Sequence, residues 1–260
     1  MPDTQKTLGF IGTGTIAQAF IEGLVASGKT NPVLLSPRSE AVSSSLCEQF
    51  PHVRRATSNA EVAEQSEIVF LGMRPPQVEE ALEGVSFRSD QIVCSFVAGF
   101  LLDDLARVIP QPTLCRVIPL PAIAACEGPV ALFPKVPELS ELLTGMGELV
   151  EPERETDFVA MGAVSGFMSS YYELQGTLLD WMTSRGVAPD TASTYMRALF
   201  AGLAQTSLHS DKSFAELAAE HQTKGGLNER TRKGLIEDGW FARATQAIET
   251  VQKVRREALD

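Results

Sequence analysis

The sequence predicts an α/β protein in which a doubly wound sheet over residues 1–152 is followed by an all-helical domain over residues 153–260. A glycine-rich turn near the start of the chain lies between an apolar run and a helical pattern. Up to about residue 150, short apolar runs alternate with helical patterns, which is typical of parallel strands joined by helices. Beyond that point the spacing is helical throughout. These three observations predict an N-terminal Rossmann domain and a helical C-terminal domain.

The glycine turn has the pattern G-x-G-x-x-A, in which Ala17 is the third small residue. Such a turn lets backbone N–H groups and a helix N-terminus approach a pyrophosphate, so it predicts a bound dinucleotide. The residues of the turn that we expect to bind this cofactor are Gly12, Gly14, Thr15, Ile16 and Ala17. The alternative is a purely structural turn between a strand and a helix, without a ligand.

The second apolar run, residues 32–35, leads to the residues that select the cofactor. An NAD site usually has Asp or Glu about 20 residues after the turn, where the carboxylate binds the ribose hydroxyls. This chain has Ser36, Arg38 and Ser39 there, and no acid before Glu40. Two hydroxyls and a guanidinium suit a 2′-phosphate, so NADP(H) is the expected cofactor. The alternative for Arg38 is the role of a solvated loop residue.

Composition and charge narrow the function further. The chain has 260 residues, of which 44% are hydrophobic, and this suits one medium domain with a smaller partner. A net charge of −11 argues against nucleic acid or an anionic membrane surface as partner. No apolar run approaches the roughly 20 residues of a membrane span, and the first residues do not resemble a secretory signal. We therefore expect a cytoplasmic enzyme that acts on a small molecule.

The cysteines and histidines do not predict a metal site. The four cysteines show no C-x-x-C pair and no other metal-ligand spacing, and the three histidines do not cluster with them. Cys94 and Cys115 lie within apolar runs, so we expect them to be buried as small hydrophobic residues. The sequence thus predicts free cysteines in a reducing compartment and no bound metal.

The remaining elements of the first domain follow the α/β alternation. Continuous apolar runs, typical of strands buried on both faces, predict strands at residues 68–73, 92–97 and 113–118. Helices are expected at residues 60–66, 77–82 and 101–108. Residues 130–133 and 149–150 are expected to add strands at the far edge of the sheet.

Long apolar helices are expected in the second domain. Their spacing predicts helices over residues 155–184, 188–208, 214–220 and 229–258, the last with a break at 238–239. The Rossmann domain alone would not cover helices this apolar. We therefore expect them to pack against a second copy of the chain, which makes the protein a homodimer or a larger homo-oligomer.

Several short motifs occur along the chain in the order found in one enzyme family. An F-I-G-x-G-x-M-A-like turn is matched by residues 10–17, an S-x-x-A-G motif by residues 95–99, and the first six positions of R-x-M-P-N-x-P by residues 116–121. By these motifs the chain resembles pyrroline-5-carboxylate reductases, NADPH-dependent enzymes that make proline from a cyclic imine. The resemblance implies further cofactor-binding residues at Met73, Arg74, Pro75, Ala98 and Gly99.

The substrate-binding motifs of that family are altered here. Residues 165–171 stand where the family has S-G-S-G-P-A-Y, and residues 223–228 stand where it has S-P-G-G-T-T, whose donors hold the substrate carboxylate. Leu120 replaces the Asn of P-N-x-P. The resemblance implies that the substrate-binding residues are Ser165, Gly225, Gly226, Leu227 and Asn228. Gly225 and Gly226 can also be read as a simple break between two helices.

Two side chains are candidates for a catalytic role. Tyr171 matches the family's Tyr, and His221 lies just before the Gly-Gly break, with a charge that can change near neutral pH. The alternatives are a core tyrosine and a capping or surface histidine. The expected function is an NADPH-dependent reductase of a cyclic imine carboxylate, with 1-pyrroline-5-carboxylate, and hence proline biosynthesis, as first candidate. A paralogous imine or keto reductase and a non-catalytic nucleotide-binding protein remain alternatives.

Overall fold

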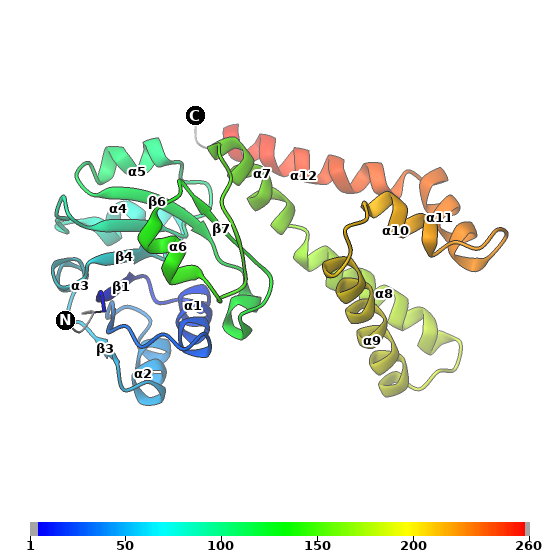
Figure 1. The fold of residues 1–260 in the computed structure, drawn as a ribbon, viewed down its shortest axis with the longest axis horizontal. Helices are drawn as coiled ribbons and strands as arrows, with labels where there is room; N and C mark the ends of the chain where they lie inside the picture. Colours follow the sequence, from blue (N-terminus) through cyan, green and yellow to red (C-terminus); the bar gives the residue numbers. More distant parts are fainter. Residues whose placement is uncertain (1–4, 258–260) are drawn as a thin grey trace. The chain divides into compact units, whose positions relative to one another are not determined.

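An eight-stranded sheet organises the N-terminal part of the chain (Figure 1). The structure is a computed structural model that describes residues 5–257. The strand order is β3-β2-β1-β4-β5-β6-β7-β8, and all neighbours are parallel except β6 and β7. The predicted doubly wound sheet is therefore confirmed. The strands are β1 (Leu8–Ile11), β2 (Val33–Leu35), β3 (Val53–Arg55), β4 (Ile68–Leu71), β5 (Ile92–Ser95), β6 (Thr113–Ile118), β7 (Pro129–Phe133) and β8 (Glu148–Val150).

Helices cover both faces of the sheet. Successive strand residues point to opposite faces, and because the strands are apolar at successive positions, both faces have apolar side chains to bury. Phe10 of β1 belongs to the core on one face and Ile11 to the core on the other. The first core takes residues from α1 (Thr15–Ala26), α2 (Glu40–Gln49), η2 (Pro121–Ala125) and α6 (Pro137–Leu143). The second takes residues from α3 (Asn59–Gln65), α4 (Val78–Leu82), which follows η1 (Pro75–Gln77), and α5 (Leu102–Val108).

Phenylalanines fill the centre of the first core. Phe10 of β1 stacks on Phe70 of β4 with 4.8 Å between ring centroids, and Phe20 of α1 lies 4.9 Å from Phe70. All three side chains are fully buried. Burying an aromatic ring of this size stabilises a fold by about 1.5–3 kcal/mol. The cluster holds α1 against β1 and β4, and it thereby fixes the glycine turn that joins β1 to α1.

The sequence patterns do not predict α2, β3 or α6. The α2 segment, EAVSSSLCEQ, is rich in small polar residues and buries Ser43 and Leu46, so its apolar face is too narrow to show as a helical period. The β3 segment is VRR, with Val53 as its buried residue. Its register is set by its neighbour, since Val53 pairs with Val33 of β2. Such elements are specified by the sheet that they join more than by their own residues.

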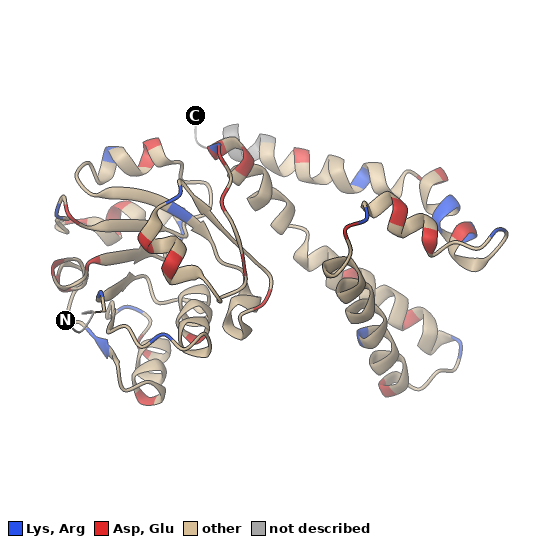
Figure 2. Cartoon of the chain, in the orientation of Figure 1, with Lys and Arg blue, Asp and Glu red and all other residues tan. Residues whose placement is uncertain are grey.

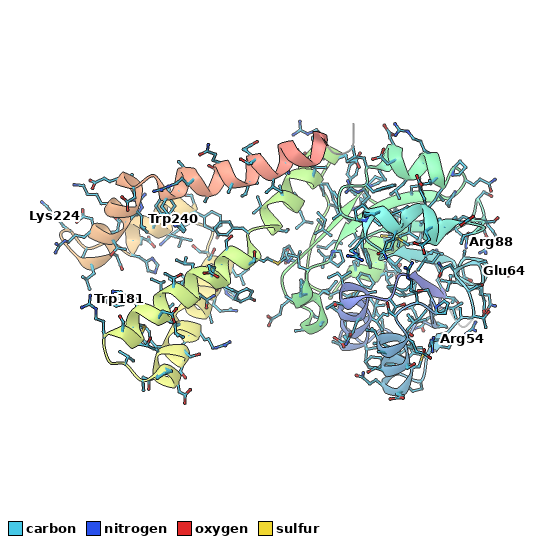
Figure 3. The ribbon with its side chains drawn as sticks, turned by 180° about the vertical axis from the view of Figure 1, so that it is seen from behind. Arg54, Glu64, Arg88, Trp181, Lys224 and Trp240 are labelled. Atoms are coloured by element: carbon cyan, nitrogen blue, oxygen red, sulfur yellow. The ribbon has the colours of Figure 1, made fainter. Side chains whose placement is uncertain are left out.

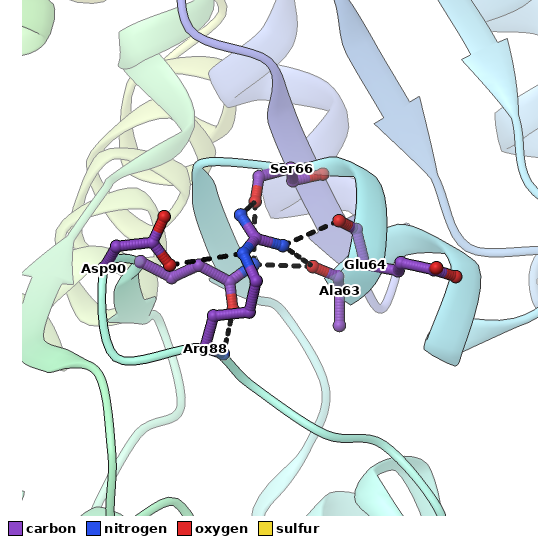
Figure 4. Close-up of polar contacts among 6 residues, drawn as sticks. Ala63, Glu64, Ser66, Arg88 and Asp90 are labelled. Carbon is purple, nitrogen blue, oxygen red and sulfur yellow. Dashed lines mark hydrogen bonds and ion pairs between the residues drawn. The ribbon is translucent and has the colours of Figure 1, made fainter.

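The loop before β5 closes the end of α3 with polar contacts (Figure 4). Arg88 donates hydrogen bonds to the carbonyl oxygens of Glu64 at 2.6 Å and Ser66 at 3.2 Å. Gln91, which is 1% exposed, donates to the carbonyl oxygens of Ala63 and Ser66. The last carbonyl groups of a helix have no partner within it. These two side chains supply the partners and tie α3 to the sheet.

A buried arginine ties the start of α7 (Glu155–Ser165) to the sheet as well. Nη1 of Arg116 in β6 lies 2.9 Å from Oε1 of Glu155, and its guanidinium carbon lies 4.8 Å from the ring centroid of Phe158. The same Glu155 oxygen accepts the N–H of Leu102 at 3.0 Å. The first compact unit accordingly extends to Gly162, later than the expected boundary after residue 152.

From Ala163 on, the chain forms a second compact unit made of helices. The expected single helix over residues 155–184 is wrong, because the chain turns between α7 and α8, where the N–H of Gly166 bonds to the carbonyl of Ala163. The expected break at residues 238–239 is confirmed, with φ +68° at Gly239. The helices are α8 (Met168–Ser184), α9 (Pro189–Leu208), α10 (Phe214–Glu220), α11 (Leu227–Glu237) and α12 (Trp240–Glu257).

The helical unit buries few of its own side chains. Among its described residues, the buried hydrophobic ones are Ala192 and Met196. Helices α8 and α9 carry few charges (Figure 2), and Trp181, 59% exposed, stands out from α8 (Figure 3). We call their exposed large hydrophobic residues the α8–α9 apolar surface: Met168, Tyr171, Tyr172, Leu178, Trp181, Tyr195, Leu199, Leu203 and Leu208.

No helix in the described part of the chain is long and apolar enough to cross a membrane. Among the side chains that the structure describes, no group of His, Cys, Asp and Glu is arranged to hold a metal ion. Cys94 of β5 and Cys115 of β6 lie opposite each other in the register of the two strands, without a disulfide bond. Both are fully buried, as predicted. Burial raises the pKa of the Cys94 thiol, which keeps it protonated and unreactive.

Candidate functional site

A cleft of 460 Å³ lies at the carboxyl ends of β1, β2 and β4. Strand β1 stands between β2 and β4, where the order of the strands reverses, and doubly wound sheets bind their ligands at this place. Most of the predicted cofactor residues line the cleft. These are Gly12, Gly14, Thr15, Ile16, Ser36, Arg38, Ser39, Met73 and Arg74.

The other four predicted cofactor residues do not line this cleft. Ala17 is fully buried in α1 and has a packing role. Pro75 begins η1, where its fixed φ suits the first helical position. Ala98 and Gly99 lie in the loop after β5, and Gly99 has φ +86°. Contact of these residues with a cofactor stays a prediction.

Two glycines make the close approach of β1 and β4 possible. Gly12 has φ +93°, and a Cβ there would lie 2.8 Å from the carbonyl carbon of Gly72. A Cβ on Gly72 would in turn lie 2.5 Å from the carbonyl oxygen of Gly12. Cβ atoms do not approach backbone this closely, so both positions require glycine. The turn after β1 is therefore locked against the residue that follows β4.

Gly14 is open toward the cleft. A Cβ built at Gly14 would meet no described heavy atom within 4 Å, so the packing of the chain itself does not require glycine there. Gly14 lines the cleft and caps the N-terminus of α1, whose first turn carries no acidic residue. A helix start of this kind presents free N–H groups and positive potential. The residues present thus fit the pyrophosphate of a dinucleotide, which would use the space beside Gly14.

Ser36, directly after β2, holds the glycine turn through a hydrogen bond. Its side chain is fully buried, and Oγ accepts the N–H of Gly12 at 3.0 Å and lies 3.3 Å from Oγ1 of Thr13. Thr13 is fully buried too. The Ser36 hydroxyl is therefore committed to the turn in this structure, and its predicted contact with a 2′-phosphate stays a prediction.

The loop after β2 is held in an unusual backbone conformation. Ser39 has φ +69°, a left-handed value that costs a non-glycine residue about 1–2 kcal/mol. Arg55 of β3 braces the loop, because its Nη2 donates to the carbonyl of Pro37 at 3.1 Å and its Nη1 lies 3.0 Å from Glu40 Oε1. Arg38 extends from this braced loop, and its side chain is 59% exposed. The loop therefore presents a cation at the rim of the cleft.

Sequence patterns alone did not point to several lining residues. Asn59 starts α3 and donates to the carbonyl of Ala81 at 2.8 Å, which joins two walls of the cleft. Gln77 accepts from the backbone N–H of Arg74 at 3.3 Å and from its side-chain Nε at 3.4 Å. Gly72 carried a usable signal, since it is a glycine within the otherwise apolar run over residues 68–73. The polar residues Asn59 and Gln77 carried none, because only the fold brings α3 and η1 to the cleft.

The two predicted catalytic side chains lie on different helices of the helical unit. The ring of Tyr171 on α8 is edge-on to Tyr172 and to Phe200 of α9, with centroids 5.4 and 5.6 Å away. His221 follows α10, and its Nδ1 lies 2.8 Å from the carbonyl oxygen of Leu217. Both side chains are exposed. Their catalytic roles stay predictions.

The predicted carboxylate-binding turn already holds a carboxylate of the chain. The N–H of Gly225 donates to Oε2 of Glu229 at 2.5 Å, and the N–H of Gly226 donates to the carbonyl of Thr223 at 2.8 Å. Asn228 donates from Nδ2 to the carbonyl of His221 at 2.7 Å. The turn is thus able to bind a carboxylate group, and Glu229 occupies one of its donors.

The other predicted substrate residues are placed as follows. Leu227 begins α11 and is 82% exposed, so it adds no polar contact to the turn. Ser165 ends α7 and is half-buried. Contact of either residue with a substrate stays a prediction.

Comparisons with known proteins agree with this geometry. The family described as "NADP oxidoreductase coenzyme F420-dependent" matches residues 7–99, the part that forms most of the cleft. Pyrroline-5-carboxylate reductase 3 from Danio rerio is 27% identical over 267 residues, which cover 98% of this chain and 93% of that protein. Pyrroline-5-carboxylate reductase from Escherichia coli is 34% identical over 110 residues, or 40% of each chain.

Solved structures share the fold. A 1-pyrroline-5-carboxylate reductase from Streptococcus pyogenes superposes with a TM-score of 0.86 at 22% identity and covers 98% of this chain and 100% of its own. A reductive aminase from Aspergillus terreus, solved with NADPH and ethyl levulinate, gives a TM-score of 0.60 at 15% identity, with 98% and 94% covered. The sequence similarity extends over the whole length and the fold is shared from end to end. The chain is therefore similar to pyrroline-5-carboxylate reductases in sequence and in fold.

Proposed function

We propose that the protein is an NADPH-dependent reductase of a cyclic imine that carries a carboxylate, with 1-pyrroline-5-carboxylate as the first candidate. One observation carries the proposal: the cleft at the carboxyl ends of β1, β2 and β4 joins an open helix start at Gly14 to a cationic rim at Arg38. Similarity to pyrroline-5-carboxylate reductases over nearly the whole chain supports the reaction class, an oxidoreductase acting on a C=N bond.

The cofactor is NADP(H). The loop after β2, residues 36–39, contains no acidic residue and instead presents Arg38 and Ser39 at the cleft. A guanidinium is a donor fork with a fixed positive charge, which matches a phosphate. A related structure, pyrroline carboxylate reductase from Plasmodium falciparum, contains bound NADP and covers 98% of this chain with a TM-score of 0.83 at 17% identity.

The chemistry asks little of the protein beyond position and charge. Bound NADPH supplies a hydride to the imine carbon, and protonation of the imine nitrogen makes that carbon a better acceptor. The chain holds the cofactor through the glycine turn and the β2 loop. We assign the substrate carboxylate to the turn at Gly225, whose N–H binds a carboxylate in this structure, and we keep Tyr171 and His221 as candidates for contact with the substrate.

The protein is proposed to act as a homodimer through the α8–α9 apolar surface. Its aromatic members are well exposed, with Tyr172 at 70% and Tyr195 at 59%. Exposed apolar area of this extent on neighbouring helices is typical of an interface. Light scattering coupled to size-exclusion chromatography tests the assembly, and a monomer at micromolar concentration would contradict it.

The decisive experiment measures NADPH oxidation by the purified protein with 1-pyrroline-5-carboxylate and, in parallel, with 1-pyrroline, the same ring without a carboxylate. Turnover of the carboxylated imine with a lower KM than 1-pyrroline is expected. Replacing Arg38 by Ala should weaken NADPH binding by about 1–3 kcal/mol and leave NADH binding nearly unchanged. An equal effect on both cofactors would contradict the phosphate assignment.

A second candidate is a reductase of an imine without a carboxylate. It is favoured by the Glu229 carboxylate, which occupies the N–H of Gly225 and replaces the group that a substrate would bring. Turnover of 1-pyrroline with no turnover of the carboxylated imine would support it. The Glu229→Gln variant distinguishes the two candidates further: gain of activity on the carboxylated imine means that Glu229 competes with the substrate for this turn.

A further inference from the structure

An ion pair joins two walls of the nucleotide cleft. Nη1 of Arg38, in the loop after β2, lies 3.2 Å from Oε1 of Glu80 on α4. Arg38 lines the cleft, and so do Gln77 and Ala81, which flank Glu80 in the sequence. The loop and the helix are far apart along the chain, so this contact across the cleft exists only in the folded protein.

The pair uses the cation that the proposed function assigns to the 2′-phosphate. Within the described residues, Glu80 is the hydrogen-bonding partner of the Arg38 guanidinium. A phosphate that binds Arg38 has to displace this carboxylate or share the guanidinium with it. Two anions beside one cation repel each other, and both side chains are exposed enough, at 59% and 67%, to move apart.

We propose that Glu80 is a specificity-determining residue: it competes with the 2′-phosphate of NADP(H) for Arg38, which weakens binding of the phosphorylated cofactor and speeds its release. The inference rests on the proposed function, which places the 2′-phosphate at Arg38. NADH has no 2′-phosphate, so Glu80 does not affect its affinity. The Glu80 carboxylate thereby reduces the ratio of NADPH affinity to NADH affinity that Arg38 raises.

The chain offers a matched control. Glu79 precedes Glu80 on α4, is also exposed, and forms no ion pair in the described structure. Substituting either Glu by Gln removes one negative charge and retains nearly the same shape. A difference between Glu79→Gln and Glu80→Gln therefore reports the contact with Arg38 and not the net charge of the helix.

The test measures dissociation constants and dissociation rates of NADPH and NADH by fluorescence, without substrate, for the wild type, E79Q, E80Q, R38A and the R38A/E80Q double variant. We expect E80Q to bind NADPH about two- to fivefold more tightly, the factor that corresponds to an exposed ion pair, and to release it more slowly. NADH binding should not change. In the R38A background the E80Q substitution should have no effect, and high salt should reduce the gain in E80Q.

Several outcomes would overturn the proposal. Unchanged NADPH binding in E80Q would mean that the pair does not compete with the cofactor. Weaker binding of both cofactors would mean that Glu80 supports the nucleotide, and an equal gain in E79Q or in the R38A background would mean a general charge effect. A wild-type protein that does not prefer NADPH would contradict the proposed function itself, which the wild-type measurement shows before any variant is compared.

Discussion

The sheet unit and the helical unit differ in how completely each buries its own apolar side chains. Every residue of β1, β4 and β5 is buried, and two cores lie on the two faces of the sheet. In the helical unit, Trp181 is 59% exposed and Leu208 is 74% exposed. Burial of apolar side chains within one chain is therefore enough to stabilise the sheet unit. The helical unit leaves large apolar side chains exposed, as a surface does that another molecule covers.

The same contrast separates the two candidate binding regions. The residues that line the nucleotide cleft belong to the sheet unit, and their backbone is fixed by buried contacts such as that of Ser36 with Gly12. The turn at Gly225 belongs to the helical unit and is held by exposed polar contacts. The proposed nucleotide site is thus preorganised by one chain, and the proposed substrate turn has less support from its surroundings.

The largest effect is expected from Gly12→Ala. The substitution adds strain at φ +93° to a clash with the backbone of Gly72, and we expect a loss of about 3 kcal/mol in the free energy of unfolding together with loss of NADPH binding. Gly28→Ala is the control, because Gly28 has φ +81° with nothing within 4 Å of its Cβ, and it should cost only about 1 kcal/mol. Chemical denaturation measures both values. Equal losses would show that the close approach to Gly72 is not what requires glycine at the turn.

A charge on the α8–α9 apolar surface is expected to have the next largest effect. Trp181→Glu should raise the dissociation constant of the proposed dimer about thirtyfold or more, since buried aromatic anchors contribute about 2 kcal/mol or more to an interface. Val108→Glu in the sheet unit is the control, because Val108 is 40% exposed and lies outside the proposed interface. Sedimentation velocity over a range of concentrations measures both. An unchanged dimer in Trp181→Glu would show that this face is not covered by a second copy.

Arg116→Met tests how firmly the sheet unit holds the start of α7. The substitution leaves the Glu155 carboxylate without its cation and removes the guanidinium from the Phe158 ring. Because Glu155 is 26% exposed, we expect a loss of about 2 kcal/mol of stability, below the value for a fully buried pair. Arg107→Met breaks the pair with Asp104, in which Arg107 is 77% exposed, and should cost less than about 0.5 kcal/mol. Thermal unfolding compares the two variants. A similarly small loss of stability in both variants would show that Arg116 does not hold α7 to the sheet.

The smallest effect, and one of opposite sign, is expected from Ser39→Gly. Relief of the left-handed conformation outweighs the added entropy of the unfolded chain, so the variant should gain about 0.5 kcal/mol of stability. Ser45→Gly, within α2, should instead lose about 0.5 kcal/mol, because glycine is a poor helix former. Denaturant midpoints of the two variants decide. A loss of stability in Ser39→Gly would mean that the serine side chain stabilises the loop by more than its backbone strain costs.

Local patterns in the sequence predicted most of the sheet unit. Continuous apolar runs marked β4, β5 and β6, and the glycine spacing marked the start of α1. These features are readable because a strand that is buried on both faces must be apolar at every position. The polar segment of α2 and the short β3 carry no such periodicity, and pairing with neighbours specifies them.

The candidate site divides in the same way. Gly12, Gly14 and Arg38 were predicted from spacing, because a phosphate needs free backbone donors and a cation at fixed positions after the first two strands. Asn59 and Gln77 were not predicted, and neither were the contacts of Glu80 and Glu229. Those contacts join an anion to a donor that another part of the chain supplies, and no short-range pattern reports such a pair.

The sequence by itself determined the class of fold and the kind of cofactor, because periodicity and glycine spacing are local consequences of backbone geometry. The tertiary structure decided which polar groups are engaged: Ser36 beneath the turn, Glu80 on Arg38, and Glu229 on Gly225. Hydrogen bonds and ion pairs act over a few ångströms, and distances on that scale between distant residues exist only once the chain has folded.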